Sequence, residues 1–564
     1  MARNFQKVGV VGLGTMGAGI VEVFARAGLD VVGFEPTQDA VVRGGEHLQR
    51  STGRAVKRGR LSEADSAALH ARVRLTTDLE ELADASLVVE AAPELLEVKT
   101  EIFANLDKTC GPETILATNT SSLSVTRIAA ATGRPGQVIG MHFFNPAPVL
   151  KLVEVVRTVV SEPEVVDDIA ALARRLGKLP VVVRDRAGFV GNALLFGYLN
   201  GAMRMAEEHF ATREDIDAAM TSGAGLPMGP FALLDLIGLD TAYEVLETMY
   251  AQSRDRWHAP TPLLTQLVAA GVKGRKSGRG FYTYAAPNSP EVVPDRTGTA
   301  RDPHGAHAGQ PRTVARVGVV AATERAAELA RSFGDAGFEV VVADLRADEP
   351  EAAVQAQAEA LSGCDFVLEA AVDEPDVKRR VFAALDRVAR GGAVLATTGT
   401  LVPVVTCAAA TGRPEDVVGL HPVTRLGEGL GPVLEVVDTV LTGPDALATA
   451  IAVADRVGAR AVRCRDRAGR IVDALLVPYL NHAVRMVAAG YASADDVDTA
   501  MKAGCGYPRG PIEMLEDLGL EHVLAILDRL HDELREPGLT PVPVLEQLQT
   551  AGVAAGALRT LPTG

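Results

Sequence analysis

The chain has 564 residues, 47% of them hydrophobic and 23% charged, which indicates a globular protein with more than one hydrophobic core. No apolar run approaches the roughly 18–20 residues of a membrane span, and a formal net charge of −16 argues against nucleic acid as a partner. The five cysteines are scattered and form no CxxC pair, which argues against a metal site or disulfide framework and fits a reducing, cytoplasmic compartment.

The N-terminus enters a predicted buried strand at residues 7–11, which leaves no room for a cleavable signal peptide. A turn and then a helix follow, and the turn reads Gly12-Leu13-Gly14-Thr15-Met16-Gly17. Its glycines permit a tight turn, a close approach of a pyrophosphate and helix–strand packing, with the phosphates at the helix N-terminus. A second strand, 31–34, ends at Glu35, and an acid there suits the ribose of NAD and repels the 2′-phosphate of NADP. We therefore predict a Rossmann-type domain that binds NAD; the alternative is a glycine-rich turn without a ligand.

Residues 38–72 have a polar helical pattern that is too long for a plain crossover connection. Basic residues crowd into eleven positions of this segment: Arg50, Arg54, Lys57, Arg58 and Arg60. In an acidic chain, a polyanionic ligand needs such a local basic patch. The alternative is a solvated, charged helix face.

Two further buried strands, 87–90 and 115–118, end in loops with polar side chains. Because the carboxyl ends of parallel strands bind ligands, Glu94 and the Asn119-Thr120-Ser121-Ser122 loop are candidate site residues. Glu90 lies closer to its strand and has an equally good structural interpretation. The loop is also a good turn and helix N-cap sequence, a role that suits Ser122.

His142 ends a β-like run just before a Pro-marked turn, and Glu154 lies twelve residues later in a second β-like run. Two such strands can place an imidazole beside a carboxylate, which then fixes the tautomer and steadies the imidazolium of a general base. The alternative is a structural histidine and a surface glutamate.

The order and spacing of these features, with Asn192 fifty residues beyond His142, resemble the L-3-hydroxyacyl-CoA dehydrogenase family, including its short-chain 3-hydroxybutyryl-CoA dehydrogenases. The resemblance implies NAD as cofactor and an acyl-CoA substrate. It implies catalytic roles for His142, Glu154, Ser121 and Asn192. It implies cofactor contacts from Gly12, Gly14, Thr15, Met16, Gly17, Glu35, Glu94, Lys99, Asn119 and Lys276. It implies substrate contacts from Ser51, Lys57 and Arg58 to the CoA nucleotide, and from Ser121 to the C3 oxygen.

The chain repeats itself beyond a Pro-, Gly- and Asp-rich linker. The sequence Arg465-Asp466-Arg467-Ala468-Gly469 repeats residues 184–188, and residues 367–371 repeat residues 88–92. We predict a Rossmann-type domain at 1–186, an all-α domain at 187–285, a linker at 286–313, a second Rossmann-like domain at 314–467 and a second helical domain at 468–564. The whole two-domain α/β plus all-α unit is thus predicted to be duplicated.

The second copy lacks several of these groups. Its first turn reads Val320-Ala321-Ala322-Thr323-Glu324-Arg325, without glycine, and Thr398-Gly399-Thr400 replaces Asn119-Thr120-Ser121. Asp473 replaces Asn192, while His421 and Glu435 remain, two residues further apart than the first pair. We predict a copy without catalysis; the alternative is a second active site for another ligand.

The sequence therefore predicts that the first half oxidises a short-chain L-3-hydroxyacyl-CoA with NAD, or runs the reverse reaction. Two alternatives are a dehydrogenase of a free hydroxy acid and a non-catalytic NAD- or acyl-CoA-binding regulator. In the resembling family, dimers form through the helical domains. We therefore expect the two helical regions to pack as a pseudo-dimer within one chain, with further homo-oligomerisation left open.

Overall fold

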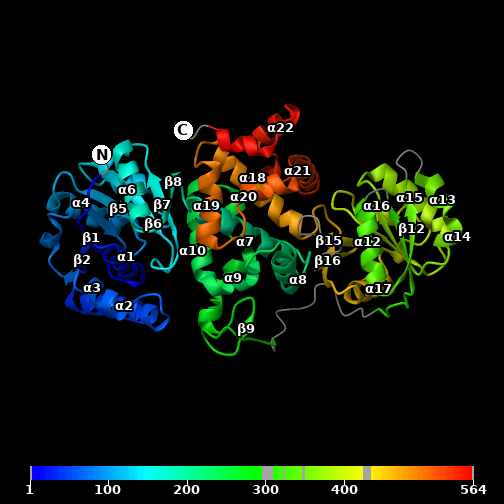
Figure 1. The fold of residues 1–564 in the computed structure, drawn as a ribbon, viewed down its shortest axis with the longest axis horizontal. Helices are drawn as coiled ribbons and strands as arrows, with labels where there is room; N and C mark the ends of the chain where they lie inside the picture. The colour runs from blue at the N-terminus through cyan, green and yellow to red at the C-terminus, as the bar shows by residue number, and fades with distance from the viewer. Residues whose placement is uncertain (1–2, 295–308, 322–323, 346–349, 424–432, 562–564) are drawn as a thin grey trace.

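A computed structural model describes residues 3–294, 309–321, 324–345, 350–423 and 433–561. The molecule is elongated, with an α/β lobe at each end and helices from both halves of the chain packed between them (Figure 1). The predicted fold, an α/β unit followed by a helical unit and then repeated, is confirmed. None of the helices within the described residues is long and apolar enough to cross a membrane.

The first lobe is built on an eight-stranded sheet in the order β3-β2-β1-β4-β5-β6-β7-β8. Its strands are β1 (Lys7–Val11), β2 (Asp30–Phe34), β3 (Val73–Thr76), β4 (Leu87–Glu90), β5 (Ile115–Thr118), β6 (Val138–Phe143), β7 (Leu152–Arg157) and β8 (Leu179–Arg184). All neighbours run parallel except β6 and β7, which are antiparallel. Strands β4 and β5 are buried along their whole length, as their continuous apolar runs predict for a sheet covered by helices.

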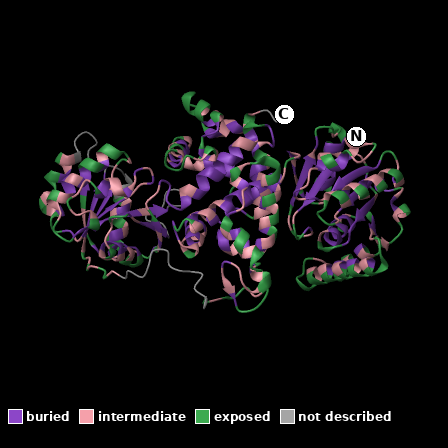
Figure 2. Ribbon diagram, turned by 180° about the vertical axis from the view of Figure 1, so that it is seen from behind, coloured by how far each residue is buried: buried purple, intermediate pink, exposed green. Residues whose placement is uncertain are grey.

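The helices of this lobe are α1 (Thr15–Arg26), α2 (Gln38–Lys57), α3 (Glu63–His70), α4 (Leu96–Thr109), α5 (Val125–Ala129) and α6 (Pro163–Arg175). Helix α1 is buried over most of its length, whereas α2 has an exposed outer face (Figure 2). Helices α2 and α3 form a hairpin, in which Thr52 Oγ1 lies 3.1 Å from His70 Nε2. The polar pattern of residues 38–72 therefore belongs to a hairpin on the outside of the lobe.

The first helical region comprises α7 (Gly191–Glu207), α8 (Arg213–Ala218), the π-helical turn η3 (Ala219–Gly223), α9 (Pro230–Ile237), α10 (Leu239–Ser253) and α11 (Pro262–Ala269). It ends in a small antiparallel sheet of β9 (Thr283–Tyr284) and β10 (Val292–Val293). Strand β10 therefore lies inside the segment predicted as a linker from residue 286, since two valines in a polar stretch leave no periodic signal in the sequence. The middle of that segment, residues 295–308, lies outside the described residues.

The second lobe repeats the first with seven strands in the order β12-β11-β13-β14-β15-β16-β17, and has no counterpart of β3 within the described residues. Its strands are β11 (Arg316–Ala321), β12 (Glu339–Asp344), β13 (Phe366–Ala370), β14 (Val394–Thr397), β15 (Val417–Val423), β16 (Val433–Asp438) and β17 (Arg460–Arg465). Its helices are α12 (Glu324–Asp335), α13 (Pro350–Ala356), α14 (Ala358–Leu361), α15 (Pro375–Val388), α16 (Val404–Ala408) and α17 (Pro444–Arg456). Residues 322–323 of its glycine-free first turn lie outside the described residues.

The second helical region consists of α18 (Val472–Ala488), α19 (Ala494–Cys505), α20 (Pro511–Leu518), α21 (Leu520–Leu534) and α22 (Pro543–Thr550). Helices α7 and α18 pack together, with the rings of Tyr198 and Tyr479 6.3 Å apart, and one hydrophobic core runs through both regions.

Each helical region also contacts the sheet of the other copy. Arg465 N donates to Phe210 O at 3.0 Å, and the equivalent Arg184 N donates to Tyr491 O at 3.3 Å. The two copies are therefore related by approximate two-fold symmetry.

Candidate active site

A histidine and a glutamate on adjacent strands form the centre of the site. His142 on β6 lies opposite Glu154 on β7, and its Nδ1 is 2.7 Å from Glu154 Oε2. Both side chains are buried, Glu154 completely. A carboxylate that accepts a hydrogen bond from the Nδ1–H group leaves Nε2 unprotonated and able to accept a proton from a substrate. The two strands thus bring the pair together in a geometry that suits an oriented general base.

The other carboxylate oxygen of Glu154 joins the sheet to the helical domain. Glu154 Oε1 accepts hydrogen bonds from the backbone N–H groups of Val190 at 3.0 Å and Gly191 at 2.9 Å, where α7 begins. Asn192 follows on the same turn, so this anchor fixes the position of Asn192 relative to the dyad. The sequence does not reveal the two donors, because backbone N–H groups carry no residue-type signal.

Glu94 forms several hydrogen bonds with the loop that follows β5. One of its oxygens accepts hydrogen bonds from Thr120 Oγ1 at 2.5 Å, Ser121 N at 2.9 Å and Ser122 N at 3.1 Å. Burial raises the pKa of Glu94, but the charge of Lys99 and these hydrogen bonds outweigh it, so the pKa lies below its usual value. A carboxylate at this position therefore stays ionised and holds Ser121 at the carboxyl edge of the sheet.

Two further contacts fix this loop. Asn119 Oδ1 accepts a hydrogen bond from Phe143 N at 2.8 Å, next to His142. Gln252 Nε2, on the last turn of α10, donates to Ser122 O at 3.0 Å and so links the loop to the helical domain. The sequence analysis missed Gln252, since a glutamine late in an amphipathic helix gives no signal of such a long-range contact.

Lys99 lies inside the lobe rather than on a ligand-facing surface. Its side chain is 1% exposed and its Nζ lies 2.6 Å from Glu90 Oε1 and 3.4 Å from Glu94 Oε2. Glu90 also accepts a hydrogen bond from Thr118 Oγ1 at 2.7 Å. The geometry therefore fits Lys99 for positioning Glu94, and gives Glu90 the structural role that the sequence left open.

The glycine-rich turn borders a cavity of about 790 Å³, which is lined by Gly12, Gly14, Thr15, Met16, Phe34, Glu35 and residues of the loop after β4 and of α4. A carbon added at Gly17 would lie 1.7 Å from Gly12 O, whereas one added at Gly14 would meet nothing within 4 Å. Helix α1 begins beside Gly14 without a side-chain cap, so its first N–H groups face this space. The cavity and turn therefore fit the phosphates and ribose of a dinucleotide.

The remaining predicted residues lie elsewhere. Lys276 Nζ pairs with Asp240 at 2.5 Å in the helical domain, and the structure does not bring it to the dinucleotide cavity. Lys57 and Arg58 are exposed at the end of α2, and Ser51 is half-buried on the same helix. Within the described residues, no group of three or more His, Cys, Asp or Glu side chains could hold a metal ion.

The second copy repeats the supporting contacts of the first. Lys378 Nζ lies 2.8 Å from Glu369 Oε2 inside the sheet, and Asp373 accepts hydrogen bonds from the backbone of the loop after β14. His421 lies opposite Glu435 on β15 and β16, as in the first copy, although their sequence separation is larger. The buried lysine–glutamate pair is present in both copies and is therefore explained by folding alone.

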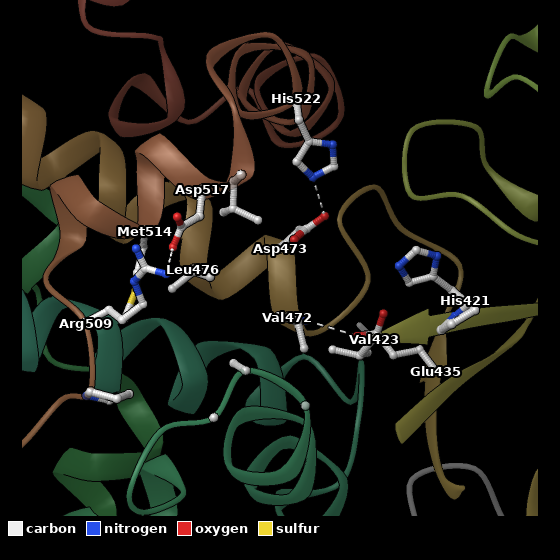
Figure 3. A pocket seen from close by; sticks show the side chains of 16 residues that line it. His421, Val423, Glu435, Val472, Asp473, Leu476, Arg509, Met514, Asp517 and His522 are labelled. Atoms are coloured by element: carbon white, nitrogen blue, oxygen red, sulfur yellow. Dashed lines mark hydrogen bonds and ion pairs between the residues drawn. The ribbon is translucent and has the colours of Figure 1, made fainter. Parts of the chain in front are cut away.

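The catalytic end of the second copy differs in charge. Arg470 takes the place of Phe189, whose ring lies 5.5 Å from that of His142, and its buried guanidinium donates to Gly399 O at 3.1 Å. A cavity of about 580 Å³ borders His421 and Glu435 (Figure 3). Across it lie two ion pairs, Asp473 with His522 at 3.0 Å and Arg509 with Asp517.

These features define an NAD-dependent dehydrogenase with a Rossmann-type domain and a helical second domain. The sequence pattern described as "3-hydroxyacyl-CoA dehydrogenase, NAD binding domain" matches residues 7–186 and 352–467, and the C-terminal domain of the same family matches residues 188–284 and 469–557. The chain belongs to the 3-hydroxyacyl-CoA dehydrogenase family, and its cofactor is NAD.

Two relatives illustrate the range of similarity. A 3-hydroxybutyryl-CoA dehydrogenase of Mycobacterium tuberculosis is 47% identical over 292 residues, which cover 50% of this chain and 100% of that protein. A 3-hydroxyadipyl-CoA dehydrogenase of Escherichia coli is 31% identical over 548 residues, which cover 97% of this chain and 98% of that protein. A crystal structure of a 3-hydroxybutyryl-CoA dehydrogenase from Escherichia coli K12 has a TM-score of 0.74 and 30% identity, and covers 98% of this chain and 100% of its own.

Proposed function

We propose that the first half of the chain interconverts a short-chain L-3-hydroxyacyl-CoA and its 3-keto form, with 3-hydroxybutyryl-CoA as the representative substrate. The observation that carries this proposal is the buried His142–Glu154 pair, anchored to the first turn of α7 beside Asn192. A relative that matches the first half at 47% identity is a 3-hydroxybutyryl-CoA dehydrogenase.

In the proposed mechanism, His142 Nε2 accepts the proton of the C3 hydroxyl. Glu154 accepts a hydrogen bond from the Nδ1–H group of His142 and stabilises the resulting imidazolium cation. Ser121 and Asn192 hold the C3 oxygen as it becomes a carbonyl, so its position is set before the reaction. NAD, when bound, supplies the acceptor for the hydride from C3. The basic end of α2, with Ser51, holds the CoA nucleotide.

The test is NADH oxidation with 3-ketoacyl-CoA substrates of increasing chain length, with free acetoacetate as the comparison. Activity with acetoacetyl-CoA and none with the free acid supports the proposal. The reverse preference would indicate a free hydroxy acid substrate, and no activity with either would indicate a regulator. His142→Ala should lower turnover by roughly 10²–10⁴-fold without unfolding the protein.

A second candidate substrate is a dicarboxylic 3-hydroxyacyl-CoA. It is favoured by the relative that matches almost the whole tandem chain, which is a 3-hydroxyadipyl-CoA dehydrogenase. The two candidates differ in a charged terminal carboxylate, so the ratio of kcat/KM for 3-oxoadipyl-CoA and acetoacetyl-CoA separates them.

For the second copy we infer a non-catalytic, supporting role. Ser121 and Asn192 are replaced there by Thr400 and Asp473, and the buried Arg470 lies where Phe189 flanks the catalytic histidine of the first copy. The packing of α7 on α18 supports an intra-chain pseudo-dimer, in which each helical region covers the apolar face of the other.

A further inference from the structure

The end of α19, in the second half of the chain, lies against the active-site strands of the first half. A carbon added at Gly504 would lie 2.6 Å from Leu152 Cδ2 and 3.6 Å from Phe144 Cε1. The ring of Phe144 lies 4.6 Å from that of His142. This end of α19 is therefore separated from the catalytic histidine by a single phenylalanine ring.

The next residue, Cys505, is the last residue of α19. Burial and the negative charge of Glu154 raise the pKa of the Cys505 thiol to about 12, so the thiol is neutral at physiological pH. It is half-buried, whereas the other four cysteines of the chain are buried. Cys505 is thus a small, uncharged and partly exposed side chain at the end of α19.

The approximate two-fold symmetry shows what such a segment borders. In the second copy, the residues equivalent to 504–506 are Gly223, Ala224 and Gly225, from the first half of the chain. They line the cavity of about 580 Å³ that contains His421 and Glu435 (Figure 3). The pocket of the second copy therefore has a wall that comes from the first copy, and the symmetry places residues 504–506 at the equivalent position beside the first copy.

The same cavity continues into the helical domain. It extends from His421 along α20, past Met514 and Leu518. The equivalent residues of the first copy are Leu233 and Ile237 on α9, which are apolar. A chain extending from a C3 carbon held at His142 would therefore pass between α9 and residues 504–506.

We propose that residues 504–506 of the second copy form one wall of the acyl pocket of the first copy, and that the size of residue 505 limits the length of the accepted acyl chain. This inference rests on the proposed function and assigns the second half a part in substrate choice. A glycine on either side of Cys505 leaves its side chain as the main bulk of this wall.

The test compares kcat/KM of the full-length protein for 3-ketoacyl-CoA substrates of four, six and eight carbons. Cys505→Leu adds bulk to the wall and Cys505→Ala removes it. Ala224→Leu adds the same kind of bulk at the symmetric position, in the pocket of the second copy, and is the matched control. Circular dichroism and the KM for NADH verify that each variant is folded.

We expect Cys505→Leu to lower the six- to four-carbon ratio of kcat/KM by about tenfold or more, because a methylene that no longer fits a pocket is worth roughly 10–200-fold in discrimination. Cys505→Ala should raise that ratio, and it carries the test if the leucine variant does not fold. Ala224→Leu should leave the ratio within about twofold.

A folded Cys505→Leu variant with the wild-type ratio, or an Ala224→Leu variant that lowers the ratio equally, would overturn the inference. An unchanged ratio in Cys505→Ala would overturn it where the leucine variant is unfolded. A wild-type protein inactive on every 3-ketoacyl-CoA would instead refute the proposed function.

Discussion

Replacing Glu154 by glutamine separates the orienting role of this carboxylate from its packing. Oε1 accepts two backbone N–H bonds, from Val190 and Gly191, and an amide can accept them only through its oxygen. The amide NH₂ must then face His142 Nδ1, where the carboxylate oxygen lies at 2.7 Å. An NH₂ donor there forces the imidazole proton onto Nε2, the atom that has to accept the substrate proton.

The magnitude follows from these contacts. A hydrogen bond to a charged group is worth about 1.5–3 kcal/mol, which corresponds to roughly 10–150-fold in rate. The wrong tautomer adds to this loss, since a carboxylate-to-amide change beside a catalytic histidine can lower kcat by about 10⁴-fold. We therefore expect Glu154→Gln to lower kcat by between about 10- and 10⁴-fold, with little change in the KM for NADH.

The second copy provides the matched control for this measurement. Glu435 accepts the equivalent bonds from Ile471 N at 2.9 Å and Val472 N at 3.0 Å. Glu435→Gln is the same substitution at the equivalent position of the second copy and should leave kcat with acetoacetyl-CoA unchanged. A Glu154→Gln enzyme within threefold of the wild type, or an equal loss in both variants, would refute the assigned role of Glu154.

Four further predictions follow from the site and the fold. Glu35→Ala should reduce the preference for NAD over NADP in kcat/KM, because the carboxylate that repels a 2′-phosphate is removed; an unchanged ratio would contradict the assignment. Reversing Lys57 and Arg58 to glutamate should raise the KM for acyl-CoA but not for NADH, and less so in high salt; a KM insensitive to both would give the patch another role. Burial raises the pKa of Glu435 from 4.5 to about 8, so the folded state holds its proton longer than the unfolded state. The unfolding free energy should therefore fall as the pH rises through this window, and Glu435→Gln should flatten the fall in urea denaturation between pH 5 and pH 9. A fragment without residues 311–564 should dimerise or aggregate in light scattering, whereas a fully active monomer would show that the second copy is not needed to cover the first.

The sequence predicted those parts of the fold and site that depend on local pattern. Apolar runs and glycine spacing placed β1, the dinucleotide turn and α1, and two β-like runs placed His142 opposite Glu154. Sequence separation was a poorer guide in the second copy. His421 and Glu435 are two residues further apart than the first pair, yet they share the same cross-strand register, because the extra residues fall between β15 and β16.

Contacts between distant segments had no such signal. The burial of Lys99 depends on how α4 packs against β4, whereas the family resemblance implied a cofactor contact for this residue. The approach of Gly504 to Leu152 joins residues from opposite halves of the chain, and it arises only when α19 packs on β7. The two-valine strand at 292–293 was likewise too short to show a period.

Residues 504–506 and the equivalent residues 223–225 are separate positions of one chain, which affects how the two halves can evolve. In a dimer of identical subunits, one codon specifies the residue at this position in both sites, so every substitution is made twice. Here Cys505 and Ala224 are encoded separately, and Ala224 borders the cavity of the second copy. Mutation at one position can change one of the two sites and leave the other as it is. The two segments have already diverged, because α19 ends as a regular α-helix whereas the equivalent residues Ala219–Gly223 form a π-helical turn.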